Sequence, residues 1–246
     1  MNTININIKK KSFPLKIQNK TKENIIFKNF NIDINHGQFI SIFGPSGCGK
    51  TTLLNIISGL DKNFDGFINI KKDDFFKKKI SYMFQSPRLF PWLTAIENIK
   101  FPIKKKKNCE KIANDLLKKV GLEKFKNEYP NRLSGGMQRR ISLARAFISD
   151  PNILLLDEPF VSIDKKISNS LRELLIKLWK KNKPTIIFVT HDLDEAIELA
   201  DRIFFLSNLP SKVMLDYEIN LKRPRKLDNK KIISLKRLLS STTKTK

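Results

Sequence analysis

The eight residues that follow an apolar run have the composition of a phosphate-binding loop. Residues 44–51 read GPSGCGKT and satisfy the pattern G-x-x-x-x-G-K-[ST] at every position. Glycines let backbone N–H groups point at phosphate oxygens, and the helix that follows adds partial positive charge. We expect Lys50 to reach the β and γ phosphates of a nucleotide and the Thr51 hydroxyl to hold Mg²⁺. The alternative is a glycine-rich turn that happens to precede Lys-Thr.

The whole segment is therefore a candidate nucleotide site. Its expected nucleotide-binding residues are Gly44, Pro45, Ser46, Gly47, Cys48, Gly49, Lys50, Thr51 and Thr52. Within it we interpret Cys48 as a tolerated small residue and not as a catalytic thiol.

Two carboxylates end a second apolar run, in the segment ILLLDEP at residues 153–159. An acid at a strand end beside a phosphate loop can hold Mg²⁺ or its water, and the next acid can polarise an attacking water as general base. Asp157 is predicted to take the first role and Glu158 the second. The alternative is a surface Asp-Glu pair that caps the next element.

A histidine follows a third apolar run, TIIFV, and Thr190. The imidazole of His191 could contact the γ-phosphate or orient the attacking water. The alternative is a residue beside a helix cap with no part in catalysis. His36 precedes Gly37 in a predicted turn, and we interpret it as structural.

The segment LSGGMQRR at residues 133–140 places a serine and two glycines at the start of a predicted helix. Ser134, Gly135 and Gly136 have anion-binding chemistry there, but they are far along the chain from the phosphate loop. If two copies pair head to tail, this seat on one chain can close over the nucleotide held by the other. The alternative is a simple helix cap made by Ser134.

Strands and helices alternate along most of the chain. Apolar runs predict buried strands at residues 39–43, 153–156, 185–189 and 202–206, with helices between them, and this order predicts an α/β domain with a mainly parallel sheet. At the N-terminus, Ile4, Ile6 and Ile8 alternate with polar residues, which predicts a further strand. Asp192 and Glu195 are expected to form a capping box.

The domain boundaries are predicted from changes in character along the chain. We expect one domain over residues 1–228, a helical subdomain inserted at about 87–145, and a basic tail over 229–246 whose last residues are loose.

Composition bounds the function. The formal net charge of +24 favours a polyanionic partner, yet lysine runs fall in several different segments, as a coding bias towards Lys, Ile and Asn would produce. We find no apolar run long enough to span a membrane and no secretory signal. Cys48 and Cys109 lack metal-site spacing, and the default compartment is the reducing cytoplasm.

Taken together and in this order, the motifs resemble those of the ATP-binding cassette (ABC) ATPases. The resemblance covers nearly the whole chain and implies a P-loop NTPase fold with an antiparallel β part at the N-terminus and an inserted helical subdomain. GPSGCGKT is similar to their Walker A motif, ILLLDEP to Walker B and LSGGM to the signature. The resemblance implies these further roles: catalytic Glu158, switch histidine His191, Q-loop and metal-ligating Gln85, metal ligands Thr51 and Asp157, signature residues Ser134, Gly135, Gly136 and Met137, and D-loop residues 162–164 with Asp164.

The family also places an aromatic side chain against adenine, upstream of Walker A. Phe13 is the candidate by position, and Phe27 and Phe30 are its rivals.

The segments at 89–99, LFPWLTAIENI, and 221–225, LKRPR, resemble the ATPases of nitrate, sulfonate and taurine importers, and related importers of pyrimidine precursors share them. This resemblance implies ATP and Mg²⁺ as cofactors. It implies a second copy of the chain and membrane permease subunits as partners, and a periplasmic or extracellular solute-binding protein as an indirect one. The chain would sit peripherally on the cytoplasmic face of the membrane and bind no specific nucleic acid. The alternatives are an exporter or lipoprotein-release ATPase, a nucleic-acid-acting cassette and an assembly-factor ATPase.

Overall fold

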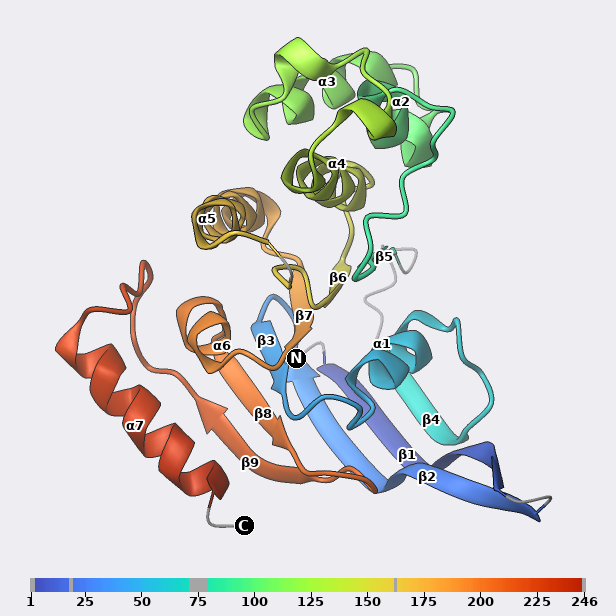
Figure 1. Cartoon of the computed structure of the whole chain (residues 1–246), viewed down its shortest axis with the longest axis vertical. Coiled ribbons are helices and arrows are strands. Elements are labelled where there is room, and N and C mark those ends of the chain that lie inside the picture. Colours follow the sequence, from blue (N-terminus) through green and yellow to red (C-terminus); the bar gives the residue numbers. More distant parts are fainter. Residues whose placement is uncertain (1–2, 18–19, 71–78, 162, 245–246) are drawn as a thin grey trace. The chain divides into compact units, whose positions relative to one another are not determined.

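The computed structural model describes residues 3–17, 20–70, 79–161 and 163–244 (Figure 1). The chain forms two compact units. The first comprises Met1–Phe76 with Thr185–Lys246, and the second comprises Lys77–Pro184. The first unit is thus built from both ends of the chain and the second from its middle.

An antiparallel sheet forms the N-terminal part of the first unit. Its strand order is β2 (Lys20–Asn35), β1 (Thr3–Ile17) and β4 (Asp65–Ile70). Ile4, Ile6 and Ile8 are all buried, so the alternating pattern correctly predicted a strand with one apolar face. The antiparallel β part implied by the family resemblance is confirmed.

The second sheet of this unit carries the candidate chemistry. Strand β3 (Phe39–Phe43) pairs in parallel with β7 (Thr185–Thr190) and with β8 (Arg202–Leu206), and β9 (Val213–Glu218) pairs with β8 antiparallel. The register opposes Phe43 to Thr190 at the carboxyl ends of β3 and β7. The segments that follow these strands therefore leave the same edge of the sheet, where ligands of parallel α/β sheets bind.

In the described part of the first unit there are three helices: α1 (Lys50–Ser58), α6 (Leu193–Leu199) and α7 (Lys230–Lys244). The residues that the sequence presented only as a basic tail form α7, because Ile232, Leu235 and Leu239 recur on one face and are buried. Lys236 on α7 pairs with Asp194 on α6 at 2.6 Å. Residues 245–246, where loose residues were predicted, lie outside the described part of the chain.

The LKRPR segment caps the end of α6. Arg225 is buried and donates to the carbonyls of Ile197 and Ala200, among others, and Arg223 donates to the carbonyl of Leu199. These are carbonyls at the end of α6, which has no further turn to bond them. The segment that resembled a subfamily marker therefore has a structural role.

The predicted capping box at α6 is wrong. Asp192 does cap the helix, since its carboxylate accepts from the N–H groups of Asp194 and Glu195. Glu195, however, accepts from the Thr190 hydroxyl at 2.6 Å. A complete capping box occurs instead in the second unit, between Thr94 and Glu97 at the start of α2 (Ala95–Lys100).

In the second unit, β5 (Ile80–Met83) pairs in parallel with β6 (Ile153–Asp157), and Met83 lies opposite Leu156. The helical elements described in this unit are, in chain order, α2, η1 (Phe101–Ile103), α3 (Cys109–Lys119), η2 (Glu123–Phe125), η3 (Pro130–Arg132), α4 (Gly135–Ile148) and α5 (Lys165–Asn182). Helix α4 packs against α2, α3 and α5. The helix predicted at the 133–140 segment is confirmed as α4, and further helices precede and follow β6, as the predicted alternation requires.

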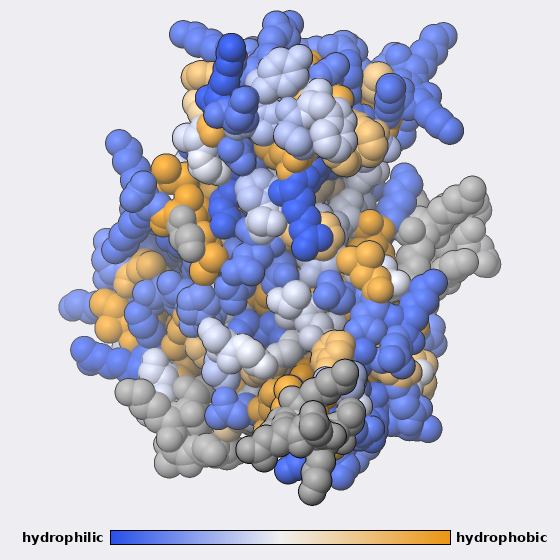
Figure 2. Space-filling model, turned by 45° about the vertical axis from the view of Figure 1, so that its right-hand side comes forward, coloured by the Kyte–Doolittle hydropathy of each residue, from blue (hydrophilic) through white to orange (hydrophobic). Residues whose placement is uncertain are grey.

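Basic side chains are dispersed, not gathered. Hydrophilic residues are spread over the face drawn in Figure 2. Lysines 104–107 lie exposed between η1 and α3, and Lys180 and Lys181 lie exposed in the last turn of α5. Lys11 differs, because it is buried and pairs with Asp61 at 2.7 Å. The high net charge is therefore not concentrated on one described element.

Candidate nucleotide site

The phosphate loop connects β3 to α1 in the first unit. Gly47 and Gly49 have φ of 78° and 97°, in the region that favours glycine. A Cβ on Gly49 would lie 2.5 Å from the Ile26 Cγ2 atom, so any other residue would both strain the backbone and clash. Among the described residues, no side chain caps α1 and no acid lies in its first turn. This helix start is suited to an anion.

Lys50 is folded onto the loop. Its Nζ donates to the carbonyls of Gly44 and Pro45, both at 2.8 Å, and the side chain is 5% exposed. These bonds hold the ammonium where it can neutralise phosphate charge. Cys48 is buried, and burial raises the pKa of its thiol, which keeps the thiol protonated at neutral pH. The thiol is therefore not an activated nucleophile.

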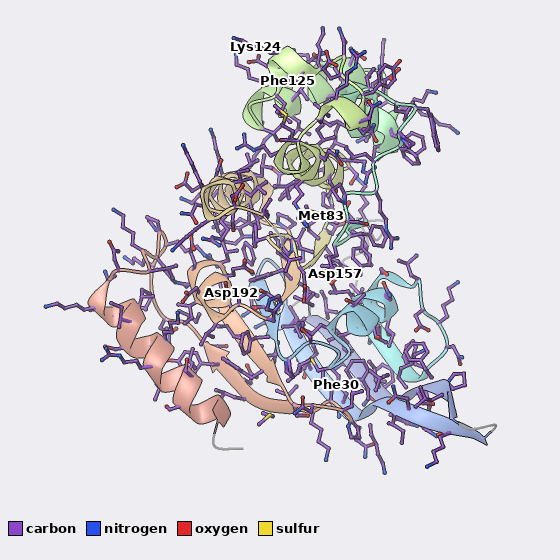
Figure 3. All side chains as sticks on the ribbon, in the orientation of Figure 1. Phe30, Met83, Lys124, Phe125, Asp157 and Asp192 are labelled. Carbon is purple, nitrogen blue, oxygen red and sulfur yellow. The ribbon has the colours of Figure 1, made fainter. Side chains whose placement is uncertain are left out.

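His191 follows β7 at the same sheet edge. The Thr190 hydroxyl donates to Glu195 at 2.6 Å and accepts from the Asp192 N–H at 3.0 Å, which fixes the turn that carries His191. Figure 3 shows Asp192 at the start of α6. His191 lines a hollow of about 860 Å³ together with Gly44 and Pro45 of the phosphate loop. The first unit thus brings the predicted switch histidine and the predicted phosphate loop together.

The second unit brings Gln85 and Glu158 together. Because β5 and β6 run in parallel, the residues that follow them leave the same edge, and Gln85 Nε2 donates to Glu158 Oε2 at 3.3 Å. Glu158 has a φ of 42°. This left-handed backbone conformation costs a residue other than glycine about 1–2 kcal/mol. Strain of this kind is concentrated at functional sites.

Asp157 is the last residue of β6 and is 4% exposed (Figure 3). The Tyr82 hydroxyl points at its Oδ2 atom from 3.4 Å. Burial, followed by the charge of Asp157, raises the pKa of Tyr82 above its ordinary value, so the phenol stays protonated. Sequence reasoning missed Tyr82; its place in β5, three residues before Gln85, was the available signal.

The predicted Mg²⁺ ligands carry oxygen atoms that suit this ion. The described residues contain no group of three or more His, Cys, Asp or Glu side chains that could hold a metal by themselves. Thr51, Gln85 and Asp157 offer a hydroxyl, an amide and a carboxylate oxygen, which suits Mg²⁺, an ion that keeps waters and takes phosphate oxygens. Thr51 belongs to the first unit, and Gln85 and Asp157 to the second. Their roles remain predictions.

The two glycines of the signature segment differ in their surroundings. Ser134 caps α4 by accepting from the Met137 N–H at 3.3 Å, as the helix-cap alternative requires. A Cβ on Gly136 would lie 2.9 Å from Ile167 Cγ2, so helix packing explains this glycine. A Cβ on Gly135 would meet nothing within 4 Å. The packing of the described chain therefore gives no reason for glycine at 135.

The D-loop prediction is only partly covered. Asp164 is the residue before α5, and its carbonyl accepts from the Ser168 N–H at 2.8 Å. Ser162 lies outside the described residues.

Phe13 is the exposed member of the three aromatic candidates. It is 41% exposed on β1, and Lys11 Nζ lies 4.3 Å from its ring centroid. Phe27 and Phe30 are 0% and 1% exposed and pack against each other in the core. Burial removes both rivals as stacking platforms, and the assignment of Phe13 to adenine stays a prediction.

The comparison with protein families decides the identity of the fold. The family model described as "ABC transporter" matches residues 27–161. The chain belongs to the ABC transporter family. The ABC cassette fold implied by the motifs is thereby confirmed, and the chain is an ABC transporter ATPase.

Several relatives of this ABC protein resemble it over most of its length. It is 45% identical over 206 residues to the aliphatic sulfonates import ATP-binding protein SsuB of Bacillus cereus, covering 81% of each chain. It is 38% identical over 225 residues to SsuB of Bacillus subtilis, covering 90% of this chain and 87% of that one. It is 40% identical over 227 residues to the uncharacterized ABC transporter ATP-binding protein MJ0412 of Methanocaldococcus jannaschii, covering 86% and 84%.

Solved ABC structures agree. The dimeric structure of MJ0796, a bacterial ABC transporter cassette, matches with a TM-score of 0.74 at 34% identity, covering 89% of this chain and all of that one. A dimeric post-hydrolysis state of MJ0796 bound to ADP and Pi matches with a TM-score of 0.72 at 33% identity over the same shares. In the part of the ABC chain that the structure describes, none of the helices has the length and apolar character that crossing a bilayer requires.

Proposed function

We propose that this chain is the ATP-hydrolysing subunit of an importer of aliphatic sulfonates. The observation that carries the proposal is the 45% and 38% identity to two SsuB proteins over most of each chain. Among the solutes that the sequence suggested, this likeness favours sulfonates, the class to which taurine belongs, over nitrate and pyrimidine precursors. It also favours an importer over an exporter or a lipoprotein-release system.

Two copies of the chain would bind two ATP molecules between them. In each shared site the phosphate loop of one copy would face Ser134, Gly135 and Gly136 of the other. The open space beside Gly135 supports this arrangement, because a nucleotide of the partner copy can occupy space that the chain itself leaves empty. The two similar solved structures are dimeric.

Each site residue then has a task that its chemistry suits. Lys50 and the N–H groups at the start of α1 bind phosphate, and Phe13 stacks on adenine. Glu158 accepts a proton from the attacking water, and His191 orients that water or contacts the γ-phosphate. Thr51, Gln85 and Asp157 would hold Mg²⁺, which supplies positive charge to neutralise the phosphates.

The solute would never touch this chain. Permease subunits in the membrane would carry it, a periplasmic or extracellular binding protein would deliver it, and this subunit would lie peripherally on the cytoplasmic face. Closure of the dimer around ATP would drive the permease, and hydrolysis would release it. The lysines are dispersed over several described elements, which argues against a specific nucleic acid as partner.

Co-purification from gently solubilised native membranes tests this function. The tagged chain should bring down a protein with several membrane spans, and the binding protein of that system should bind alkanesulfonates in preference to nitrate and pyrimidines. Recovery of only soluble partners or nucleic acid would refute the transport role. A binding protein that prefers nitrate would refute sulfonates as the solute but leave the proposed importer role intact.

A further inference from the structure

Helix α4 of the second unit carries a buried arginine that holds the segment after Glu158. Arg139 is 8% exposed, and its guanidinium donates to the carbonyl of Pro159 at 3.1 Å and to that of Val161 at 2.9 Å. These carbonyls belong to the first three residues after Glu158, on the way to Asp164. The path of the chain that leaves the predicted general base is therefore attached to α4.

A second arginine of α4, six residues further on, holds the segment after Gln85. Arg145 donates to the carbonyl of Arg88 at 2.9 Å and to that of Pro87 at 2.8 Å. Its guanidinium also lies 5.8 Å from the ring centroid of Phe90. One helix, α4 (Figure 1), thus holds both segments, and it begins at Gly135, directly after Ser134.

Neither arginine has an ion-pair partner among the described residues. Burial lowers the pKa of both guanidinium groups, which shows that desolvation opposes their charge. Hydrogen bonds from a charged donor to carbonyls are among the stronger ones, and a guanidinium can hold two carbonyls in one fixed geometry. A carboxylate partner would satisfy such a charge without contacting either loop. Bonding the guanidinium to two backbone carbonyls instead fixes the position of the segment that carries them.

Arg140 on the same helix provides a comparison. It donates to the carbonyl of Val120 at 3.3 Å and to the Ser170 hydroxyl at 3.0 Å, and so connects α4 to α3 and α5. It makes as many hydrogen bonds as Arg139 or Arg145 but touches neither site segment.

We infer that Arg139 and Arg145 are positioning residues for ATP hydrolysis, which fix the segments after Glu158 and Gln85 to the signature helix α4. The inference rests on the proposed function for the roles of Glu158 and Gln85. Its consequence is mechanical: a displacement of the Gln85 segment moves α4, and α4 moves the Glu158 segment and Ser134 with it.

Amide hydrogen exchange of the purified full chain tests the contacts without using activity. The Val161 N–H donates to the carbonyl of Glu158 at 3.3 Å, and the Phe90 N–H donates to Asn98 Oδ1 at 2.8 Å, so both report on their segments. Arg139→Met should speed exchange at Val161 about tenfold and leave Phe90 unchanged, because the loss of a charged donor frees only that segment. Arg145→Met should do the reverse.

ATPase kinetics test the link to the reaction. Arg139→Met and Arg145→Met should each lower kcat at least about tenfold with KM for ATP changed less than about twofold, since the phosphate loop is untouched. Arg139→Lys should recover part of kcat, because lysine keeps a charged donor but lacks the planar two-pronged geometry of the guanidinium. Arg140→Met is the control: it should lower Tm as much as the other two and leave kcat within about twofold.

Three results would overturn the inference: equal kcat loss in all three methionine variants, unchanged kcat in Arg139→Met and Arg145→Met, or exchange that rises equally in both segments in every variant. Each would show that these arginines only stabilise the fold. Failure of the sulfonate proposal would leave these measurements unaffected, because they use only this chain and ATP.

Discussion

The neighbouring glycines of the signature segment give opposite predictions for one and the same substitution. A Cβ at 136 would meet Ile167 Cγ2 at 2.9 Å and Cδ1 at 3.3 Å, whereas a Cβ at 135 would meet nothing within 4 Å. Overpacking costs about 1–3 kcal/mol, and replacing glycine by alanine within a helix returns up to about 1 kcal/mol. Gly136→Ala should therefore lower the free energy of unfolding by about 0–3 kcal/mol, and Gly135→Ala should leave it unchanged or raise it by up to about 1 kcal/mol.

Function should follow the opposite order. If the space at Gly135 is kept for a nucleotide on the partner copy, a methyl group there should weaken ATP-dependent dimerisation about tenfold or more, because it displaces the phosphate from the helix N-terminus. The stability assay is urea unfolding followed by circular dichroism. The dimerisation assay is light scattering after gel filtration with ATP, in a Glu158→Gln background, in which ATP turnover is predicted to be slow.

A double-mutant cycle supplies the control. Ile167→Ala removes the two closest atoms that a Cβ at 136 would meet, so Gly136→Ala should cost much less stability in that background, while Gly135→Ala should show no coupling to it. The reasoning is refuted if Gly135→Ala destabilises the chain as much as Gly136→Ala does. It is also refuted if Gly135→Ala leaves the ATP dependence of dimerisation unchanged.

Three further predictions concern the described sites. Glu158→Gln should slow phosphate release by about 10²–10⁴ and give a stable ATP-bound dimer on gel filtration, and a monomer that hydrolyses normally would contradict the general-base role. Tyr82→Phe should make the unfolding free energy fall less steeply above about pH 10. The pKa of Tyr82 is raised in the folded state, so the stability that its protonated phenol contributes is present below the unfolded-state pKa and is lost as pH rises towards the folded-state pKa. Equal urea midpoints of variant and wild type from about pH 8 to 11 would argue against this. Arg225→Met should lower the unfolding free energy by about 2–4 kcal/mol, because it leaves buried carbonyls at the end of α6 without a hydrogen-bond donor. Replacement of the exposed Lys222 by Met should change the unfolding free energy by less than about 0.5 kcal/mol in the same urea titration.

Local patterns of this sequence predicted what depends on neighbours in the chain. The phosphate loop, the strand that ends in Asp157 and the helix after Ser134 are each contiguous, and their chemistry follows from backbone geometry within a few residues. Apolar runs and the alternation at Ile4, Ile6 and Ile8 predicted strands because burial of one or both faces imposes those periods. The order of these motifs was enough to indicate the family.

Tertiary structure decided what depends on residues far apart. Gln85 reaches Glu158 only because β5 and β6 pair in a particular register, and Phe13 differs from Phe27 and Phe30 only in burial. The basic segment after residue 229 forms a helix because its apolar face packs in the first unit. The Glu195 carboxylate accepts a hydrogen bond from the Thr190 hydroxyl and does not form the predicted capping box. Register, burial and partner choice are set by long-range contacts, and a single sequence records the residues that make them without recording which of them meet.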